Sequence, residues 1–280
     1  LIPPSIIMIV YGVTADVSIA KLFIAGVLPG LMLAGLFSGY IIYWALRYPE
    51  QVPANDRQYT FMEKVRESGS LIPVVCLIVA VLGSIYAGFA TATEAAAVGV
   101  VGAMVLSAVQ GSLNWSSFKE SLMGATRLYC MIALILAGAS FLTLSMGYIG
   151  LPRHLAEWIA TLGLSQFELI LALTVFYVVL GCFLDGISMV VLTMGVIMPT
   201  VQKAGIDPLW FGIFIVLVVE MAQITPPVGF NLFVLQGMTG RDLLWIAKAT
   251  LPMFFLMVVA VLLIYFFPGI VTWMPQQMKL

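Results

Sequence analysis

The sequence predicts an all-α integral membrane protein, and three observations lead to this fold class. Of the 280 residues, 62% are hydrophobic and only 9% are charged. The mean hydropathy of +1.11 lies far outside the range of soluble domains. The apolar segments are long, mixed runs of Leu, Ile, Val, Met and Phe, unlike the alternating stretches of about ten residues in membrane β-barrels. The chain should therefore cross a lipid bilayer as helices.

Five apolar segments have about the length of 20 residues that crosses a bilayer. They are expected at Leu22–Leu46, Leu71–Ala87, Ala92–Val109, Tyr129–Ile149 and Ile246–Pro268. Residues 47–70 hold the one long polar stretch and predict an extramembrane connector. If this connector is cytoplasmic, more Lys and Arg residues fall inside than outside, in agreement with the positive-inside rule. The inner residues are Arg47, Arg57, Lys64, Arg66, Lys119, Arg127, Arg241 and Lys248, and the outer residues are Lys21, Arg153, Lys203 and Lys279.

Two further apolar runs are interrupted by polar residues. Residues 167–203 contain GCFLDGISM and predict a re-entrant hairpin with its tip at Leu184–Ser188. Residues 208–238 contain MAQITPPVG and predict one helix broken at Thr225–Pro226. Each interruption leaves backbone groups unpaired, which is tolerated at membrane depth only where protein or a polar cavity surrounds the break.

Two Pro-Pro pairs indicate an internal repeat. Pro29 follows Pro4 by the same interval as Pro252 follows Pro227, and each interval holds an apolar half-helix, a polar turn and a new span. In the expected topology the two half-helices run in opposite directions, so the copies are inverted. Inverted repeats with matching broken helices are typical of secondary transporters, and the breaks form the ion and substrate site. Because proline lacks an N–H, the carbonyls freed before it can coordinate a cation.

This repeat predicts the organisation of the chain. Residues 1–46 are expected to end the first inverted repeat, and residues 47–70 to form the cytoplasmic connector. The second repeat takes residues 71–280, with the hairpin at 167–203 and the broken helix at 208–238. The chain begins at Leu1, inside the first Pro-Pro element and without a Met or a basic leader. We therefore expect it to be the later part of a longer protein.

Four phrases, taken in this order, resemble the large permease subunit of tripartite ATP-independent periplasmic (TRAP) transporters. They are LIPPSI (1–6), AGVLPGLMLAG (25–35), GFATATEAAAVG (88–99) and TPPVGFNLFV (225–234). The resemblance extends over essentially the whole chain. It implies an elevator-type sodium symporter of the bacterial inner membrane that imports an organic anion such as a carboxylate or sialic acid. It also implies two partners, a periplasmic substrate-binding protein and a small four-helix membrane subunit, separate or fused upstream.

The resemblance further implies that sodium ions bind between a hairpin tip and the neighbouring broken helix. Here the residues of that site lie at the tip and at the break: Asp185, Gly186, Ser188, Gln223, Ile224 and Thr225. The other sodium site of the family has only its far edge on this chain. Ile2, Pro4 and Ser5 at that edge are the expected substrate contacts. Ser5 starts a half-helix whose positive dipole end should face the cavity.

Several titratable residues also allow a structural interpretation. Asp185 lies between apolar arms, where a carboxylate is expensive and usually functional, but it could also cap a helix. Glu220, one turn before the break, could tune the ion site or bind the unwound backbone. Glu94 lies beside Thr91 at the start of a span, which favours a capping role. His154 is the only histidine and lies in residues 151–163, which predict an interfacial amphipathic helix.

Other function classes are poorly supported by the sequence. A serine protease of the membrane needs a Ser–His pair, and the sole histidine lies outside the expected spans. Asp185 has no second aspartate at its depth for an aspartyl protease, and no HExxH motif is present for zinc. We therefore do not expect this chain to be an enzyme. The formal net charge of -1 gives no basic surface for nucleic acid.

An ion channel remains the alternative function, because broken helices and hairpins also build selectivity filters. The two classes differ in stoichiometry. A channel passes ions without a fixed coupling ratio, whereas a symporter cannot move its substrate without its ion. The repeat favours the symporter.

Overall fold

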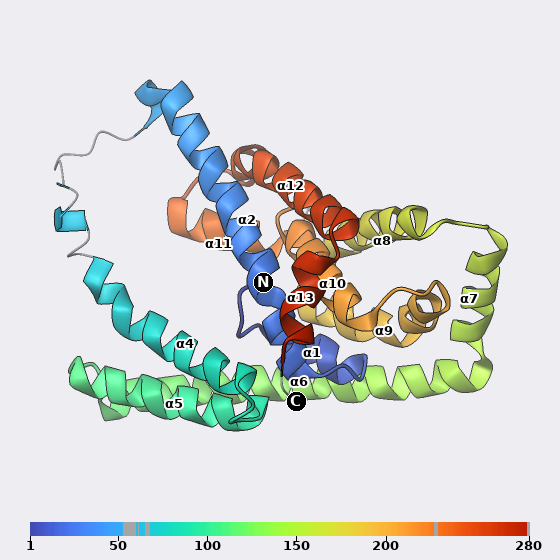
Figure 1. Cartoon of the computed structure of the whole chain (residues 1–280), viewed down its shortest axis with the longest axis horizontal. Coiled ribbons are helices and arrows are strands. Elements are labelled where there is room, and N and C mark those ends of the chain that lie inside the picture. Colours follow the sequence, from blue (N-terminus) through green and yellow to red (C-terminus); the bar gives the residue numbers. More distant parts are fainter. Residues whose placement is uncertain (53–59, 61, 65–67, 227–228, 279–280) are drawn as a thin grey trace. The chain divides into compact units, whose positions relative to one another are not determined.

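The structure is a computed structural model and describes all residues except 53–59, 61, 65–67, 227–228 and 279–280. The regular elements of these described residues are all helices (Figure 1). The chain forms two compact units, one from Leu1–Ala34 with Arg127–Gln277 and one around Gly35–Thr126. Helix α2 (Ile19–Arg47) leads from the first unit into the second, and α6 (Trp115–Ile149) leads back.

The larger unit is built around α10 (Pro208–Gln223), an apolar helix. Every side chain from Phe211 to Val219 except Gly212 has 0% of its surface exposed, as expected for a helix that is hydrophobic on all sides. The helices that contact α10 are α1 (Ile6–Thr14), α8 (Gln166–Gly181), α9 (Gly186–Lys203), α11 (Phe230–Thr239), α12 (Leu243–Phe266) and α13 (Gly269–Gln276). Helix α7 (Leu151–Thr161) packs on α9.

Three hydrogen bonds, two of them buried and one partly buried, fix these helices to one another. The Tyr11 hydroxyl donates to the Pro208 carbonyl over 2.6 Å and joins α1 to the start of α10. The indole Nε1 of Trp210 donates to the Ile264 carbonyl over 2.9 Å and joins α10 to α12. The hydroxyls of Tyr177 and Thr193 lie 2.8 Å apart and join α8 to α9. Each bond satisfies a polar group that would be costly to leave unpaired in an apolar interior.

The smaller unit contains α4 (Ile72–Tyr86) and α5 (Ala92–Val109), which pack against each other. Gly88 turns the chain between them with a φ of 74°, a conformation that favours glycine. Short 3₁₀ turns occur at Pro49–Gln51 and Ser68–Leu71 in the expected connector, part of which lies outside the described residues. Most apolar side chains of α5 are exposed, which suits a lipid-facing surface.

The observed spans differ from the expected ones mainly at two helices. In the part of the chain that the structure describes, five helices are long and apolar enough to cross a bilayer, namely α2, α5, α6, α9 and α12. Helix α4 has only 15 residues, which correspond to about 22 Å at 1.5 Å per residue. Helix α6 begins at Trp115 instead of Tyr129. The added residues include Lys119, Glu120 and Arg127, which are too polar for a membrane span but belong to residue types that form helices well.

The hairpin and the broken helix are both present. The arms α8 and α9 are joined by four residues, Cys182 to Asp185, so the non-helical tip lies slightly earlier than the expected Leu184–Ser188. Helix α10 ends at Gln223 and α11 begins at Phe230. The break thus includes the expected Thr225–Pro226, while Pro227 lies outside the described residues. Whether the hairpin is re-entrant stays a prediction.

The two expected repeat segments share one sequence of elements. In both, a short helix is followed by a long helix with a proline in its interior. The pairs are α1 with α2, which contains Pro29, and α11 with α12, which contains Pro252. The inverted orientation of the two copies and the division of the chain into repeats stay predictions.

Candidate functional site

Asp185 at the hairpin tip is the N-cap of α9. Its backbone is extended, and its Oδ2 atom accepts hydrogen bonds from the N–H groups of Ile187 at 3.1 Å and Ser188 at 3.2 Å. The capping interpretation is therefore correct, but it does not remove the ligand role. A carboxylate has about four lone-pair sites, and Asp185 is only partly buried, so it can hold a cation while it caps the helix.

The break after α10 supplies backbone oxygens. An α-helical partner for the Gln223 carbonyl would be the N–H of residue 227, and proline has none. Gly229 has a φ of 42°, and the carbonyl oxygens of Thr225 and Gln223 lie 3.0 Å and 3.1 Å from the place where its Cβ would be. The glycine thus lets two carbonyl groups come close to the restarting chain. The Thr225 hydroxyl donates to the Met221 carbonyl over 2.8 Å.

The hairpin tip packs directly on the break. A Cβ at Gly186 would lie 2.5 Å from Nε2 of Gln223 and 2.7 Å from Cγ1 of Val219, so any larger residue would force these side chains to shift. A Cβ at Gly181 would collide with Ala222. The buried Cys182 thiol donates to the Pro226 carbonyl over 3.1 Å. This bond from the hairpin tip to the break was not predicted from the sequence.

The third wall of the site comes from the start of α1. Ser5 is the N-cap of this helix, and its Oγ accepts from the Met8 N–H at 3.5 Å. Ile2, three residues earlier, packs against Gly30 of α2. A Cβ added to Gly30 would lie 2.7 Å from Cγ1 of Ile2.

A cavity of about 450 Å³ lies where these segments meet. Five of the expected site residues line it: Pro4, Ser5, Asp185, Gly186 and Gln223. The other four, Ile2, Ser188, Ile224 and Thr225, are not among its described lining residues. Glu220 and Asn231 supply its remaining polar side chains, and Ile6, Ile7, Ile187 and Val234 its apolar surface. Asn231 was missed in the sequence, although an amide in the first turn of the restarting half-helix was a usable signal.

The electrostatics of this cavity suit a cation and an anion together. Asp185 and Glu220 are its two charged groups among the described lining residues, and both are acidic. The C-terminal end of α10 adds the negative end of a helix dipole. Three helices, α1, α9 and α11, begin at the cavity, and helix N-termini attract anions. In the described part of the chain, no three His, Cys, Asp or Glu side chains lie close enough together to hold a metal ion by themselves. Backbone and hydroxyl oxygens would therefore complete a cation site.

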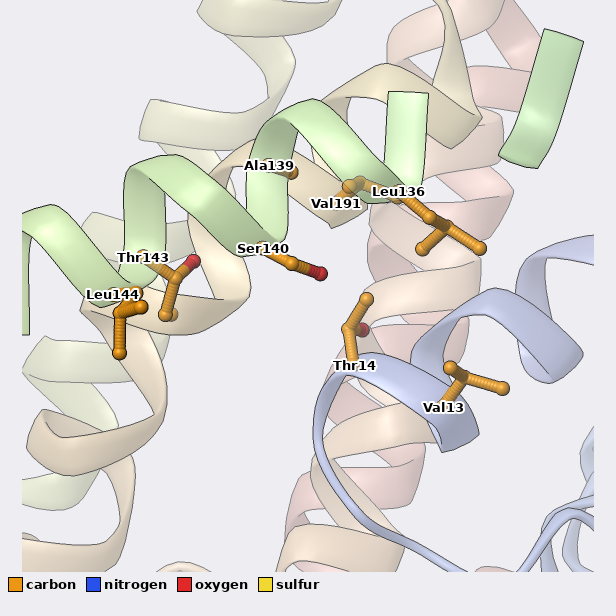
Figure 2. Close-up of a pocket in the computed structure, with 9 residues that line it drawn as sticks. Val13, Thr14, Leu136, Ala139, Ser140, Thr143, Leu144 and Val191 are labelled. Carbon is orange, nitrogen blue, oxygen red and sulfur yellow. The ribbon is translucent and has the colours of Figure 1, made fainter. Parts of the chain in front are cut away.

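A second cavity, of about 320 Å³, lies between α1, α6 and α9 (Figure 2). Figure 2 shows Thr14 of α1 and Ser140 and Thr143 of α6 at the space between these helices. Gly195 of α9 leaves room for the side chain of Thr143, because a Cβ on residue 195 would collide with it. The described lining contains hydroxyls but no charged group and none of the expected site residues. This cavity is therefore a poorer candidate for ion binding.

Comparison with known proteins places the chain in a family. Residues 1–270 match the family described as "Tripartite ATP-independent periplasmic transporter, DctM component". The chain belongs to this family. The resemblance seen in the four sequence phrases is thus confirmed over nearly the whole chain, and a multi-pass helical membrane protein agrees with both the family and the five apolar helices.

The names of relatives of this TRAP permease chain mention different substrates. The "C4-dicarboxylate TRAP transporter large permease protein DctM" of Pseudomonas aeruginosa is 34% identical, over 99% of the chain and 64% of the relative. The "Isethionate TRAP transporter permease protein DctMQ" of Oleidesulfovibrio alaskensis is 31% identical, over 96% and 42%. The "Sialic acid TRAP transporter large permease protein SiaM" of Vibrio cholerae is 28% identical, over 99% and 64%. The chain thus spans less than two thirds of these relatives.

Two other residues singled out in the sequence are not among the described residues that line the large cavity of this TRAP permease. Glu94 forms a capping box with Thr91, whose N–H and Oγ1 both donate to Glu94 Oε2 over 2.8 Å, so its capping role is confirmed. His154 lies on α7, whose Pro152 and Ala156 are buried while Arg153 and Glu157 form an exposed pair at 2.9 Å. This hydrogen bond lowers the pKa of Glu157.

Proposed function

We propose that this chain is the transporting part of a sodium-coupled importer of organic anions in the bacterial inner membrane. The observation that carries the proposal is the composition of the large cavity. It combines two carboxylates and a broken-helix C-terminus with three helix N-termini, so one space offers ligands to a cation and an anion. Such pairing is what symport requires, because each ion then lowers the electrostatic cost of binding the other.

The cation of this proposal is sodium. Its ligands would come from Asp185, Gly186 and Ser188 at the tip and from Gln223, Ile224 and Thr225 at the break. Sodium is a hard cation that prefers oxygen ligands, as calcium and magnesium do. Support comes from the Asp185 carboxylate in the cavity wall and from the carbonyls of Gln223 and Thr225, which lie together at Gly229.

The substrate of this proposal is a small organic anion, of the carboxylate or sialic acid type. Pro4 and Ser5 line the cavity and are the retained substrate contacts; Asn231 is added as a hydrogen-bond donor. Ile2 keeps only an indirect role, because it lies against Gly30. No basic side chain is among the described lining residues, so the anion would be held by helix dipoles, hydroxyls and amides. Such binding is weak, which leaves substrate selection to a soluble partner.

Two partners follow from membership of the family. One is a periplasmic substrate-binding protein that delivers the anion, and the other is a small four-helix membrane subunit. The name DctMQ of one relative, of which this chain covers 42%, is consistent with a fused small subunit in some members. The different substrates in the relatives' names also suit a permease whose selectivity lies in a separate protein.

Coupling would arise at the contact between tip and break. Sodium bound by both segments would hold the tip on α10, and this would position the N-terminus of α9 for the anion. The tight contact of Gly186 with Gln223 and the bond from Cys182 to Pro226 give this closed arrangement a specific geometry. The loaded hairpin would then move as a body, as in an elevator mechanism.

Uptake by proteoliposomes tests the proposal. The vesicles contain the full-length permease with its small subunit, and the binding protein is supplied outside with radiolabelled dicarboxylate or sialic acid. An inward sodium gradient should drive accumulation above equilibrium, with a fixed number of sodium ions for each substrate molecule. Sodium flux without substrate, or with a variable ratio, would instead favour a channel. Substrate uptake that is indifferent to sodium would contradict symport.

A further inference from the structure

A cavity of about 340 Å³ lies at the opposite end of α10 from the site described above. It is formed by the first residues of α8 and α10, the end of α12 and the start of α13. Its aromatic and polar residues are Gln166, Asp207, Trp210, Tyr265, Phe266 and Thr272. None of them belongs to the candidate transport site.

Aromatic rings are concentrated around this cavity. The ring of Tyr265 lies 5.2 Å from that of Phe167, 5.4 Å from that of Phe266 and 6.4 Å from that of Trp210, measured between centroids. Trp210 is held in place by its bond to the Ile264 carbonyl. Faces of aromatic rings carry negative potential and attract cations within about 6 Å.

The charge of the cavity also favours a cation. Asp207 is the one charged side chain among its described lining residues. Its Oδ1 caps α10 by accepting from the N–H groups of Leu209 at 2.7 Å and Trp210 at 3.4 Å. Its Oδ2 receives no hydrogen bond from the described residues. An exposed carboxylate beside aromatic rings, without a base, recognises an ammonium group by charge and by cation–π attraction.

The position of the cavity indicates where such an ammonium comes from. Helix α12, which is long and apolar enough to cross a bilayer, ends at Phe266 beside the cavity, and the ends of such helices are where lipid head groups are expected. Phe266 beside it and the next residue, Phe267, are 64% and 61% exposed and form an apolar rim, whereas Ile170 and Ile206 are buried below it. Such a rim contacts acyl chains while the carboxylate and rings contact the head group.

We propose that this cavity binds the ammonium head group of a phospholipid of the phosphatidylethanolamine type. The ammonium lies beside Asp207 and the rings of Tyr265 and Phe266, and the acyl chains follow the apolar rim. Binding at this place fastens the start of α8, the start of α10 and the end of α12 to one lipid, at the end of the hairpin remote from its tip.

Lipid retention tests this site. The full-length permease with its small subunit is reconstituted in bilayers that contain equal amounts of phosphatidylethanolamine and phosphatidylglycerol with identical acyl chains. After mild delipidation, native mass spectrometry counts the lipids that remain bound. The wild type should retain phosphatidylethanolamine in excess. Asp207→Asn should lower that excess by about threefold to fivefold, the size of an exposed charge interaction, and Phe266→Leu should lower it as well.

The control is Asp242→Asn. Asp242 caps α12 in the same way, through a 3.0 Å bond from the Leu244 N–H, but does not line the cavity. Asparagine caps helices as well as aspartate does, so both variants should keep their stability. The proposal would be overturned if the wild type retained the two lipids equally. It would also be overturned if Asp207→Asn and Asp242→Asn retained the same ratio of phosphatidylethanolamine to phosphatidylglycerol. A loss of affinity for the substrate-binding protein in Asp207→Asn with an unchanged lipid ratio would overturn it too, because it would make this surface a protein contact.

Discussion

The side-chain amide of Gln223 occupies the space that a Cβ on Gly186 would need, at 2.5 Å from it. Gly186 is the first residue of the second hairpin arm, and Gln223 is the last residue before the helix break. A side chain at the helix break thus packs against the backbone of the hairpin, although the two segments are far apart in the sequence. Several consequences of this contact can be measured.

Gly186→Ala should impair transport by separating the tip from the break. The added methyl group meets Gln223, Val219 and Ile7, and overpacking of this kind costs about 1–3 kcal/mol. If the tip closes only with sodium bound, this cost appears as a sodium concentration for half-maximal uptake that rises about tenfold or more. The measurement is the initial rate of uptake against sodium concentration.

Gly237→Ala is the matched control for this substitution. Gly237 lies in the last turn of α11, the helix that follows the break, and has nothing within 4 Å of its Cβ position. Alanine there should leave the sodium dependence unchanged. An equal response of the two variants would mean that the space at Gly186 has no special role.

Asp185→Asn and Asp185→Ala should separate the cap from the charge. Asparagine keeps the hydrogen bonds to Ile187 and Ser188, so thermal stability without sodium should change by less than about 0.5 kcal/mol. Alanine loses the cap and should cost about 1 kcal/mol. Both variants should lose the increase in melting temperature that sodium gives the wild type. A sodium-induced increase that survives in Asp185→Asn would show that the charge does not bind the ion.

Asn231→Ala should weaken substrate binding more than sodium binding. The amide lines the cavity at the start of α11, and one hydrogen bond is worth about 0.5–1.5 kcal/mol, or about twofold to tenfold in the substrate KM. Gln236→Ala, in the same helix but outside the cavity lining, serves as the control. The assignment of Asn231 fails if its substitution leaves the substrate KM at the value of the control.

Cys182 should report closure of the tip. Its thiol is buried and donates to the Pro226 carbonyl at the break, so a maleimide reaches it only when tip and break separate. In a full-length permease whose other cysteines, including Cys76 and Cys130, are replaced by serine, sodium should slow alkylation severalfold. Potassium at equal ionic strength should not. An alkylation rate that is independent of sodium would contradict the coupling mechanism.

The sequence predicted the places of the tip and the break better than the identity of every side chain in the site. Pro-Pro pairs and an aspartate within apolar runs have direct physical consequences, so Asp185 and Gln223 could be expected at one site. The direction of a side chain near a helix end depends on packing. For this reason the sequence did not indicate that Asn231 lines the cavity or that Ile2 lies beside Gly30, and the role of Ile2 as a substrate contact stays a prediction.

Helix lengths were predictable only where hydropathy and helix propensity agree. For α5 both begin at Ala92 and end at Val109, and the expected bounds equal the observed ones. For α6 they disagree, because Lys119 and Arg127 are polar yet form helices well, so the expected span began only at Tyr129. The spatial relation between Cys182 and Pro226 could not be read from the sequence, since it depends on how the hairpin packs on α10.

The central claim is that one cavity couples sodium to an organic anion through Asp185. Its most direct test is sodium-driven uptake by proteoliposomes that hold the full-length permease and its partners, with wild type, Asp185→Asn and the capping control Asp242→Asn. We predict accumulation in the wild type and in Asp242→Asn and its loss in Asp185→Asn, although the folded protein is equally abundant in all three. Sodium-driven accumulation that persists in Asp185→Asn would reduce this residue to a helix cap and contradict the account.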